Sequence, residues 1–134
     1  MRRVPRGELD YDERDGLHYL DGEPFTGVAF TLGRGAEWTK SEVSFRDGLR
    51  WGDTREWYAP GVPMVESCFL RDALHGRARE WHRNGQLAED GEYAYGIALW
   101  AKTWSEEGRL LTSRVLEEGD PAYARLVDFR RIYG

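Results

Sequence analysis

The sequence predicts an all-β fold, a series of tandem antiparallel β-hairpins that closes with a short C-terminal helix. Three observations predict it: aromatic residues that return at a fixed interval, glycines at fixed offsets from them, and alternation of residue types between the glycines. A fixed interval of roughly 20 to 50 residues is typical of repeat proteins, in which one supersecondary unit stacks on the next. With 134 residues, the chain has the size of one domain.

Large aromatic residues recur about every two dozen positions. Phe45, Phe69 and Tyr93 are separated by 24 residues each time. Trp57 and Trp81 are also 24 residues apart, and a further tryptophan follows 23 residues later at position 104. Leucines occupy the matching places further out, at Leu20, Leu32 and Leu116.

Glycines mark two kinds of turn in each unit. One glycine follows each tryptophan of the series four residues on, at Gly61, Gly85 and Gly108. Glycine accepts the positive φ that other residues resist, and Asp-Gly between apolar segments is a hairpin signal. Each unit is therefore predicted to run strand, glycine turn, strand, Asp-Gly turn. The second kind of turn is predicted at Asp21-Gly22, Asp47-Gly48, Asp72-Ala73, Gly96 and Gly119.

The segments between the turns alternate with the period of a β-strand. In GDTREWYA, Asp53, Arg55 and Trp57 share one face, and GRAREWHR repeats this order one unit later. The returning strands are MVESCFL, LAEDGEY and LLTSRVL. The segment between Leu32 and Phe45 departs from the pattern, so its turn is predicted to be irregular.

The chain is predicted to have three parts. Residues 1–15 form a charged N-terminal segment, residues 16–119 the hairpin repeats, and residues 120–134 a helix. Asp120-Pro121 is typical of an N-cap followed by proline at the first helical position. Because an open array of hairpins needs protected ends, we expect the helix to cap the last hairpin. The alternative is that it belongs to the binding surface.

Composition and charge exclude several classes of protein for this chain. Hydrophobic residues make up 40% of the chain, and no apolar stretch is long enough to insert into a membrane. The charged N-terminus does not resemble a signal peptide, and a single cysteine, Cys68, allows no internal disulfide, so a cytoplasmic location is expected. The net charge of −5 argues against a nucleic-acid groove and suits a basic partner, although it is also what solubility alone would require.

The repeat unit resembles the MORN-type repeat, in its bacterial YwqK-like antitoxin variant. GRAREWHRNGQLAEDGEY matches best, GDTREWYAPGVPMVESCFLRDA is next, and WAKTWSEEGRLLTSRVLEEG is weaker because Trp100 stands where the opening glycine belongs. The resemblance covers roughly residues 16–119. It implies an elongated, twisted antiparallel meander and a binding or scaffolding role, which for the bacterial variant is that of an antitoxin or immunity protein. It implies no catalytic residues.

The chemistry-bearing residues form no recognisable catalytic or metal motif. His18, His75 and His82 lack metal-ligand spacing. Cys68 is expected to be a buried structural thiol. Glu56 and Glu80 recur one period apart, and recurrence favours a surface role over a unique catalytic pair. We therefore expect no enzyme activity, no cofactor and no metal; a small hydrolase or lyase is the remote alternative.

Surplus aromatics and recurring charges predict a protein interface. Tyrosine and tryptophan beside charged residues are the usual anchors of such surfaces. The function predicted is an antitoxin or immunity protein that binds a basic toxin directly, as a monomer or weak homodimer. The alternative is a scaffold or self-assembling repeat protein linked to a membrane or a multiprotein complex. The binding residues predicted are Trp51, Glu56, Tyr58, Glu80 and His82.

Overall fold

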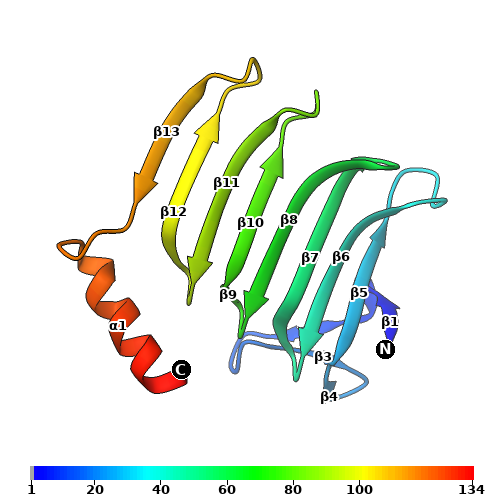
Figure 1. Ribbon diagram of the computed structural model, residues 1–134. Coiled ribbons are helices and arrows are strands. Elements are labelled where there is room, and N and C mark those ends of the chain that lie inside the picture. The colour runs from blue at the N-terminus through cyan, green and yellow to red at the C-terminus, as the bar shows by residue number, and fades with distance from the viewer. Residues whose placement is uncertain (1) are drawn as a thin grey trace.

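The computed structural model describes residues 2–134, so Met1, the first residue of the N-terminal segment, lies outside the described residues. The described residues form thirteen strands, one short 3₁₀ helix and one α-helix (Figure 1). The prediction of an all-β fold with a short C-terminal helix is confirmed. The elements are β1 (Arg3–Pro5), η1 (Arg6–Glu8), β2 (Asp10–Asp12), β3 (Leu17–Leu20), β4 (Glu23–Pro24), β5 (Gly27–Leu32), β6 (Thr39–Arg46), β7 (Leu49–Ala59), β8 (Val62–Leu70), β9 (Ala73–Leu74), β10 (Gly76–Trp81), β11 (Leu87–Ala94), β12 (Ile97–Trp104), β13 (Leu110–Val115) and α1 (Pro121–Tyr133).

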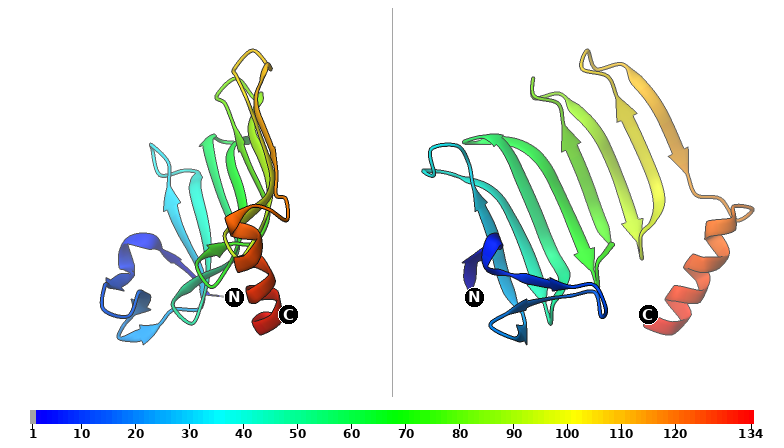
Figure 2. Two further views of the ribbon diagram at one scale, coloured as in Figure 1. Left: turned by 90° about the vertical axis from the view of Figure 1, so that its left-hand side faces the viewer. Right: turned by 180° about the vertical axis from the view of Figure 1, so that it is seen from behind.

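Ten strands build one large sheet, which is an antiparallel meander over most of its width. The strand order is β1-β5-β6-β7-β8-β10-β11-β12-β13, with the short β9 paired to β8 off this path. Only β1 runs parallel to its neighbour β5. The side and rear views show the sheet as one twisted layer (Figure 2), the shape that L-amino acids impose on strands.

The N-terminal residues fold against one end of this layer. β1 joins the edge of the large sheet, while β2, β3 and β4 form a separate three-stranded sheet. In the rear view, this small sheet lies across the face of the large sheet near the lower ends of β5 to β8 (Figure 2). Residues 2–24 are therefore part of the fold, and the small sheet covers part of one face of the large sheet.

The Asp-Gly turns have the positive φ angles that tight hairpins need. Asp47 and Gly48 have φ of 50° and 85°, the signs of a type I′ turn, whose twist matches that of the flanking strands. The turn predicted at Asp72-Ala73 lies one residue earlier, because Arg71 and Asp72 carry the positive φ values and Ala73 begins β9. An arginine and an aspartate here occupy the left-handed conformation that glycine adopts elsewhere.

A β-bulge accompanies each member of the tryptophan series. The register of the ladder shifts between Glu56 and Trp57, between Glu80 and Trp81, and again just before the tryptophan at 104. A bulge inserts one extra residue and increases the local twist. The period of about 24 residues is thus the spacing between these bulges, each of which comes shortly before a glycine turn. The irregular first unit has the same shift just before Leu32.

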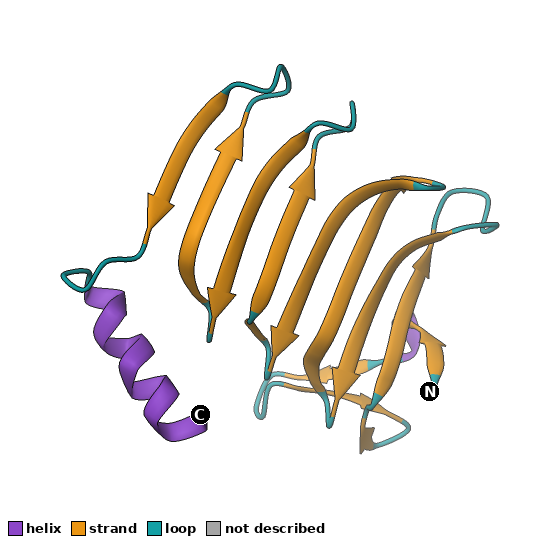
Figure 3. Cartoon of the chain, viewed as in Figure 1, coloured by secondary structure: helices purple, strands orange, loops and turns teal. Residues whose placement is uncertain are grey.

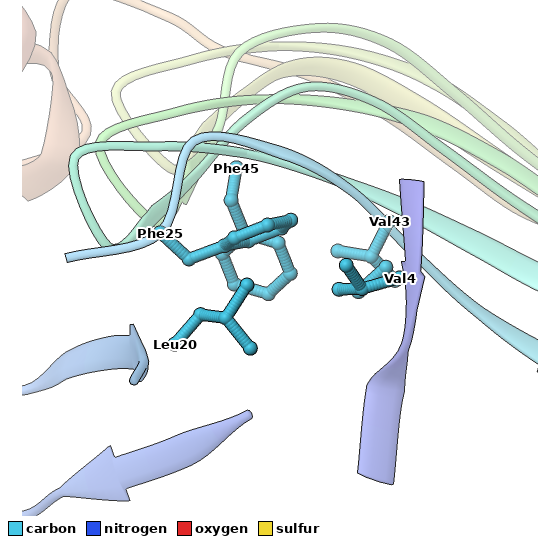
Figure 4. Close-up of a cluster of buried hydrophobic side chains, with 6 residues drawn as sticks. Val4, Leu20, Phe25, Val43 and Phe45 are labelled. Atoms are coloured by element: carbon cyan, nitrogen blue, oxygen red, sulfur yellow. The ribbon is translucent and has the colours of Figure 1, made fainter. Parts of the chain in front are cut away.

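The principal core lies under the small sheet. Side chains from the large sheet and the N-terminal segment meet there with less than a tenth of their surface exposed (Figure 4). The Phe25 and Phe45 rings pack edge to face, with centroids 5.9 Å apart. Covering this end of the large sheet therefore removes several large apolar side chains from water. The cluster comprises Val4, Leu20, Phe25, Ala29, Val43 and Phe45.

A second, smaller core joins helix α1 to the ends of the later hairpins (Figure 3). Leu126 is 2% exposed and packs with Ala94 and Ile97. The Phe129 ring stacks on Tyr95, with centroids 5.2 Å apart. The helix thus caps the hairpin ends, as predicted.

The start of this helix differs in detail from the prediction. Asp120 has the extended backbone of a cap residue, and Pro121 is the first helical residue. The Asp120 carboxylate, however, accepts a 2.8 Å hydrogen bond from the backbone N–H of Glu117 and none from the helix. Its role is to close the loop that leads into α1.

A candidate binding groove on the open face

Cross-strand register divides the side chains of the large sheet into two faces. One face, here called the ladder face, carries a row of alternating charges in which each residue has an opposite charge on the neighbouring strand. Opposite charges directly across a ladder stabilise a sheet by roughly 0.2–1 kcal/mol per pair. The ladder face therefore carries both signs of charge in alternation, and between members of the row Arg79 and Asp90 form an ion pair. The row is Glu42, Arg55, Glu66, Arg79, Asp90 and Lys102.

Asp90 is the most strongly held member of that row. Its carboxylate accepts two hydrogen bonds from the Arg77 guanidinium, both 2.7 Å long, and lies 3.6 Å from the guanidinium of Arg79. Asp90 is buried. The bonds from Arg77, opposed by burial and assisted by Arg79, hold the pKa of Asp90 below its ordinary value.

The opposite face, here called the groove face, has a row of small residues between two rows of larger ones. Thr54 pairs with Ser67 across β7 and β8, and Ala78 pairs with Gly91 across β10 and β11. The result is a groove of about 340 Å³ over β7 to β11. Small residues form its floor, with Phe69 and Tyr93 to one side and glutamates to the other.

Three glutamates line one wall of the groove, and the nearby Arg79, which also lines it, has its guanidinium 3.6 Å from Asp90. Glu80 lies directly across from Glu89, and Glu56 is separated from Glu80 by Val65 on the intervening strand. Loss of hydration in the groove, followed by the charges of Glu89 and Glu56, raises the pKa of Glu80. This side of the sheet therefore holds unbalanced negative charge, in contrast to the ladder face.

The groove floor also holds a polar atom without a partner. Thr54 is 9% exposed, lines the groove, and its Oγ1 is buried without a hydrogen-bond partner. Buried hydroxyls are almost always satisfied in native proteins, and an exception calls for a specific reason. The opposite wall carries a cation that is already occupied: Arg50 lies 3.3 Å from the Asp72 carboxylate and 4.2 Å above the Phe69 ring.

The sequence-predicted binding residues separate into three groups. Glu56 and Glu80 come together on the groove face, as part of its acidic wall. Trp51 lies on the opposite face, because its neighbour Gly52 shares the groove face with Phe69. There Trp51 packs under the guanidinium groups of two arginines, at positions 46 and 71.

Tyr58 and His82 lie at the loop ends of the hairpins, where they join one repeat to the next. The Tyr58 hydroxyl donates a 2.7 Å hydrogen bond to the carbonyl oxygen of Trp81. One period later, His82 Nε2 lies 2.9 Å from the carbonyl oxygen of Trp104, which requires Nε2 to carry the proton. The structure therefore brings Glu56 and Glu80 together in the groove and places the other three predicted residues elsewhere.

The binding residues predicted from the sequence did not include Glu89 or the small-residue floor. The position of Glu89 could have been predicted from the hairpin register, because a turn at 83–86 places it opposite Glu80. The floor gave no such signal, because Thr54, Ser67 and Ala78 are ordinary strand residues whose role depends on the size of their neighbours.

Outside the groove, Cys68 and a hollow beside α1 are the other features of the described residues that bear on chemistry. Burial, assisted by the charge of Asp53, raises the pKa of the Cys68 thiol and makes it a poor nucleophile. Within residues 2–134, no three His, Cys, Asp or Glu side chains converge as a metal site. A hollow of about 570 Å³ between α1 and β13 is lined by both signs of charge, Arg114 and Arg125 against Glu117.

Comparison with known proteins adds little to this geometry. No family model matches the chain, and no curated protein matches it. Among solved structures, the chain is similar to one from Streptococcus pneumoniae described as accessory secretory protein 1, 2 and 3, with 14% identity and a TM-score of 0.35. The match covers 84% of this chain and 20% of the other, and a likeness this low carries no argument. In the described part of the chain, no helix is both long and apolar enough to cross a membrane.

Proposed function

We propose that this chain is a MORN-type protein-binding module without catalytic activity. In this proposal it acts in the cytoplasm as an antitoxin or immunity protein that covers a basic toxin. One observation carries the proposal: the sheet has an open face with an acidic groove, while positive and negative residues alternate on its other face. An open, charged sheet face suits the wide contact of a protein interface better than the enclosure that catalysis requires.

Charge and architecture support a basic protein as the partner. The chain has a net charge of −5, and complementary charge speeds association and disfavours wrong partners. The tandem hairpins present their side chains in straight rows across the sheet. A partner surface that bears basic residues would therefore meet several acidic side chains at once.

A pair of adjacent residues on β8 tests this proposal. Ser67 lies on the groove floor, and Glu66 points to the ladder face. Tagged wild type purified from its own organism should retain a stable protein partner. A Ser67→Trp variant, which fills the groove, should lose that partner, while Glu66→Trp should keep it.

The antitoxin role has its own readout. Expression of the retained partner alone should arrest cell growth, and co-expression with wild type or Glu66→Trp should restore it. Recovery of no protein partner overturns the binding function. A partner that does not impair growth overturns the antitoxin role alone.

Self-association is the second candidate, and the outer edge of the sheet favours it. β13 has no strand on its far side in the described residues, and Leu110, Leu111 and Val115 are 51%, 60% and 65% exposed. An exposed strand edge with apolar side chains is a template for pairing with another chain. Light scattering across a range of concentrations distinguishes the two: a constant monomer mass excludes pairing through β13.

A further inference from the structure

The charges within the groove identify the kind of group that would complete it. Glu56, Glu80 and Glu89 place three carboxylates along one wall. The two arginines that line the groove are already engaged: Arg50 by Asp72 and Phe69 on the opposite wall, and Arg79 by Asp90 on the ladder face. A bound cation would remove the mutual repulsion that the glutamates now impose on one another.

The spacing of the glutamates favours a side chain over a metal ion. Adjacent strands lie about 4.8 Å apart, so Glu80 and Glu89 form a close pair and Glu56 lies roughly two strand spacings from Glu80. Residues 2–134 contain no convergent group of three metal ligands. A planar group with several donors in a fork matches carboxylates spread along a wall better than a point charge does.

The floor and the far wall supply what the rest of such a side chain needs. The small side chains of Thr54, Ser67 and Ala78 on the floor leave room for a long side chain to lie along the groove. Phe69, Leu74 and Tyr93 line the opposite side and offer apolar and aromatic surface. The aliphatic stem of a long basic side chain packs on such surface while its charged head reaches polar groups.

We propose that the groove binds a single arginine side chain presented by an exposed loop of the protein partner. Its guanidinium lies between Glu80 and Glu89, and its stem packs against Tyr93. This inference rests on the proposed binding function and names the residue by which the partner is recognised. Glu56 adds long-range attraction toward the groove.

A peptide titration tests the proposal without knowledge of the partner. The probe is a blocked heptapeptide with one central arginine between threonines and glycines. Its control has citrulline, which is neutral and of the same shape, in place of arginine. In two-dimensional NMR spectra of the full chain, the arginine peptide should shift the amide signals of Ala78, Glu80 and Glu89. The citrulline peptide should leave them in place.

Matched variants locate the binding site. The double variant Glu80→Gln with Glu89→Gln should weaken binding of the arginine peptide at least about tenfold, since each charged hydrogen bond contributes about 1.5–3 kcal/mol. Glu66→Gln removes one charge from the opposite face and should bind like wild type. Thr54→Val keeps both carboxylates and should also bind like wild type, while leaving the fold as stable as wild type or more so, because it removes an unsatisfied buried hydroxyl.

Three results would overturn the proposal: equal binding of both peptides, equal weakening by Glu66→Gln and the double glutamine variant, or no binding of the arginine peptide. These are separate from failure of the proposed function. If wild type and the double glutamine variant both retain the partner, the arginine site is refuted, but protein binding is not. If no partner is retained, the proposed function itself is refuted.

Discussion

The same cross-strand rows of side chains are covered and apolar at one end of the large sheet, and open and partly polar further along it. At β5 and β6, Ala29, Val43 and Phe45 face the small N-terminal sheet and are almost fully buried. From β7 to β11, the continuation of these rows is Thr54, Ser67 and Phe69 on the open groove face. There the floor is polar, and the aromatic side chain is only half-buried.

This difference shows how one scaffold provides both a core and a surface. Where the chain supplies its own cover, through Val4, Leu20 and Phe25, the row is apolar. Where it supplies none, polar residues enter the floor and acidic residues line its edge. The open half must then be stabilised by other contacts, namely ion pairs on the ladder face and hydrogen bonds between repeats.

The largest expected effect comes from truncating the same repeat position at the two ends. Phe45→Ala should lower the free energy of unfolding by about 3–5 kcal/mol, because Phe45 is 3% exposed in the principal core. Phe69→Ala, one period later and half-buried, should cost about 1–2 kcal/mol, because less buried surface is lost. Urea unfolding of both variants measures the difference, and equal losses would contradict the distinction between covered and open halves.

The next effect concerns the ion pairs of the ladder face. Asp90→Asn should cost about 1–3 kcal/mol at pH 7, because it breaks the paired bonds from Arg77 in a buried position. The pKa of Asp90 is lowered in the folded protein, so its contribution is present above the ordinary aspartate pKa and disappears as pH falls through the folded value.

The difference between wild type and Asp90→Asn should therefore shrink as pH falls below about 4. Urea unfolding at pH 7 and pH 3 measures this change. Asp53→Asn, an exposed aspartate on the same face, is the control and should have little effect at either pH. A pH-independent cost at position 90 would show that packing, not charge, is lost.

A smaller effect is expected from the bonds that join repeats. Tyr58→Phe removes the hydrogen bond to the Trp81 carbonyl and should lower the free energy of unfolding by about 0.5–1.5 kcal/mol. Binding of the arginine peptide should be unchanged, because this bond lies at the loop end of the hairpin. Tyr123→Phe on α1 provides a matched control. A loss of peptide affinity without a loss of stability would show that Tyr58 contributes to the binding surface.

The smallest effect distinguishes the two faces by its sign. The pKa of Glu80 is raised in the folded protein, so its ionised form is disfavoured there and stability falls as pH rises through the folded value. Glu80→Gln should leave the free energy of unfolding at pH 7 unchanged or raise it by up to about 0.5 kcal/mol. Glu66→Gln, between two arginines on the ladder face, should lower it slightly. The opposite pair of signs in urea unfolding would refute the charge assignment of the faces.

The repeat itself could be predicted from the sequence, because bulges and tight turns demand particular residues at particular places. Tryptophan and glycine at fixed offsets mark those places, and the Asp-Gly turns were predicted at Asp21 and Asp47 where the positive φ angles occur. The turn at Arg71 and Asp72 was displaced by one residue because neither is a glycine.

The binding surface was harder to predict, because it depends on which strands become neighbours and which face is covered. Glu56 and Glu80 were singled out by their recurrence, and they do line the groove. Tyr58 and His82 recur for a different reason, since each bonds the tryptophan carbonyl of the next repeat. Recurrence alone does not distinguish a residue that connects repeats from one that faces solvent.

The central prediction is that a protein partner binds the groove face of the large sheet. In a Cys68→Ser background, Ser67→Cys places a single thiol on the groove floor, and Glu66→Cys places one on the ladder face beside it. Maleimide labelling of each variant, alone and with the retained partner, measures which face is covered. We expect the partner to slow labelling at position 67 and leave position 66 unchanged; protection of position 66 alone would contradict the account.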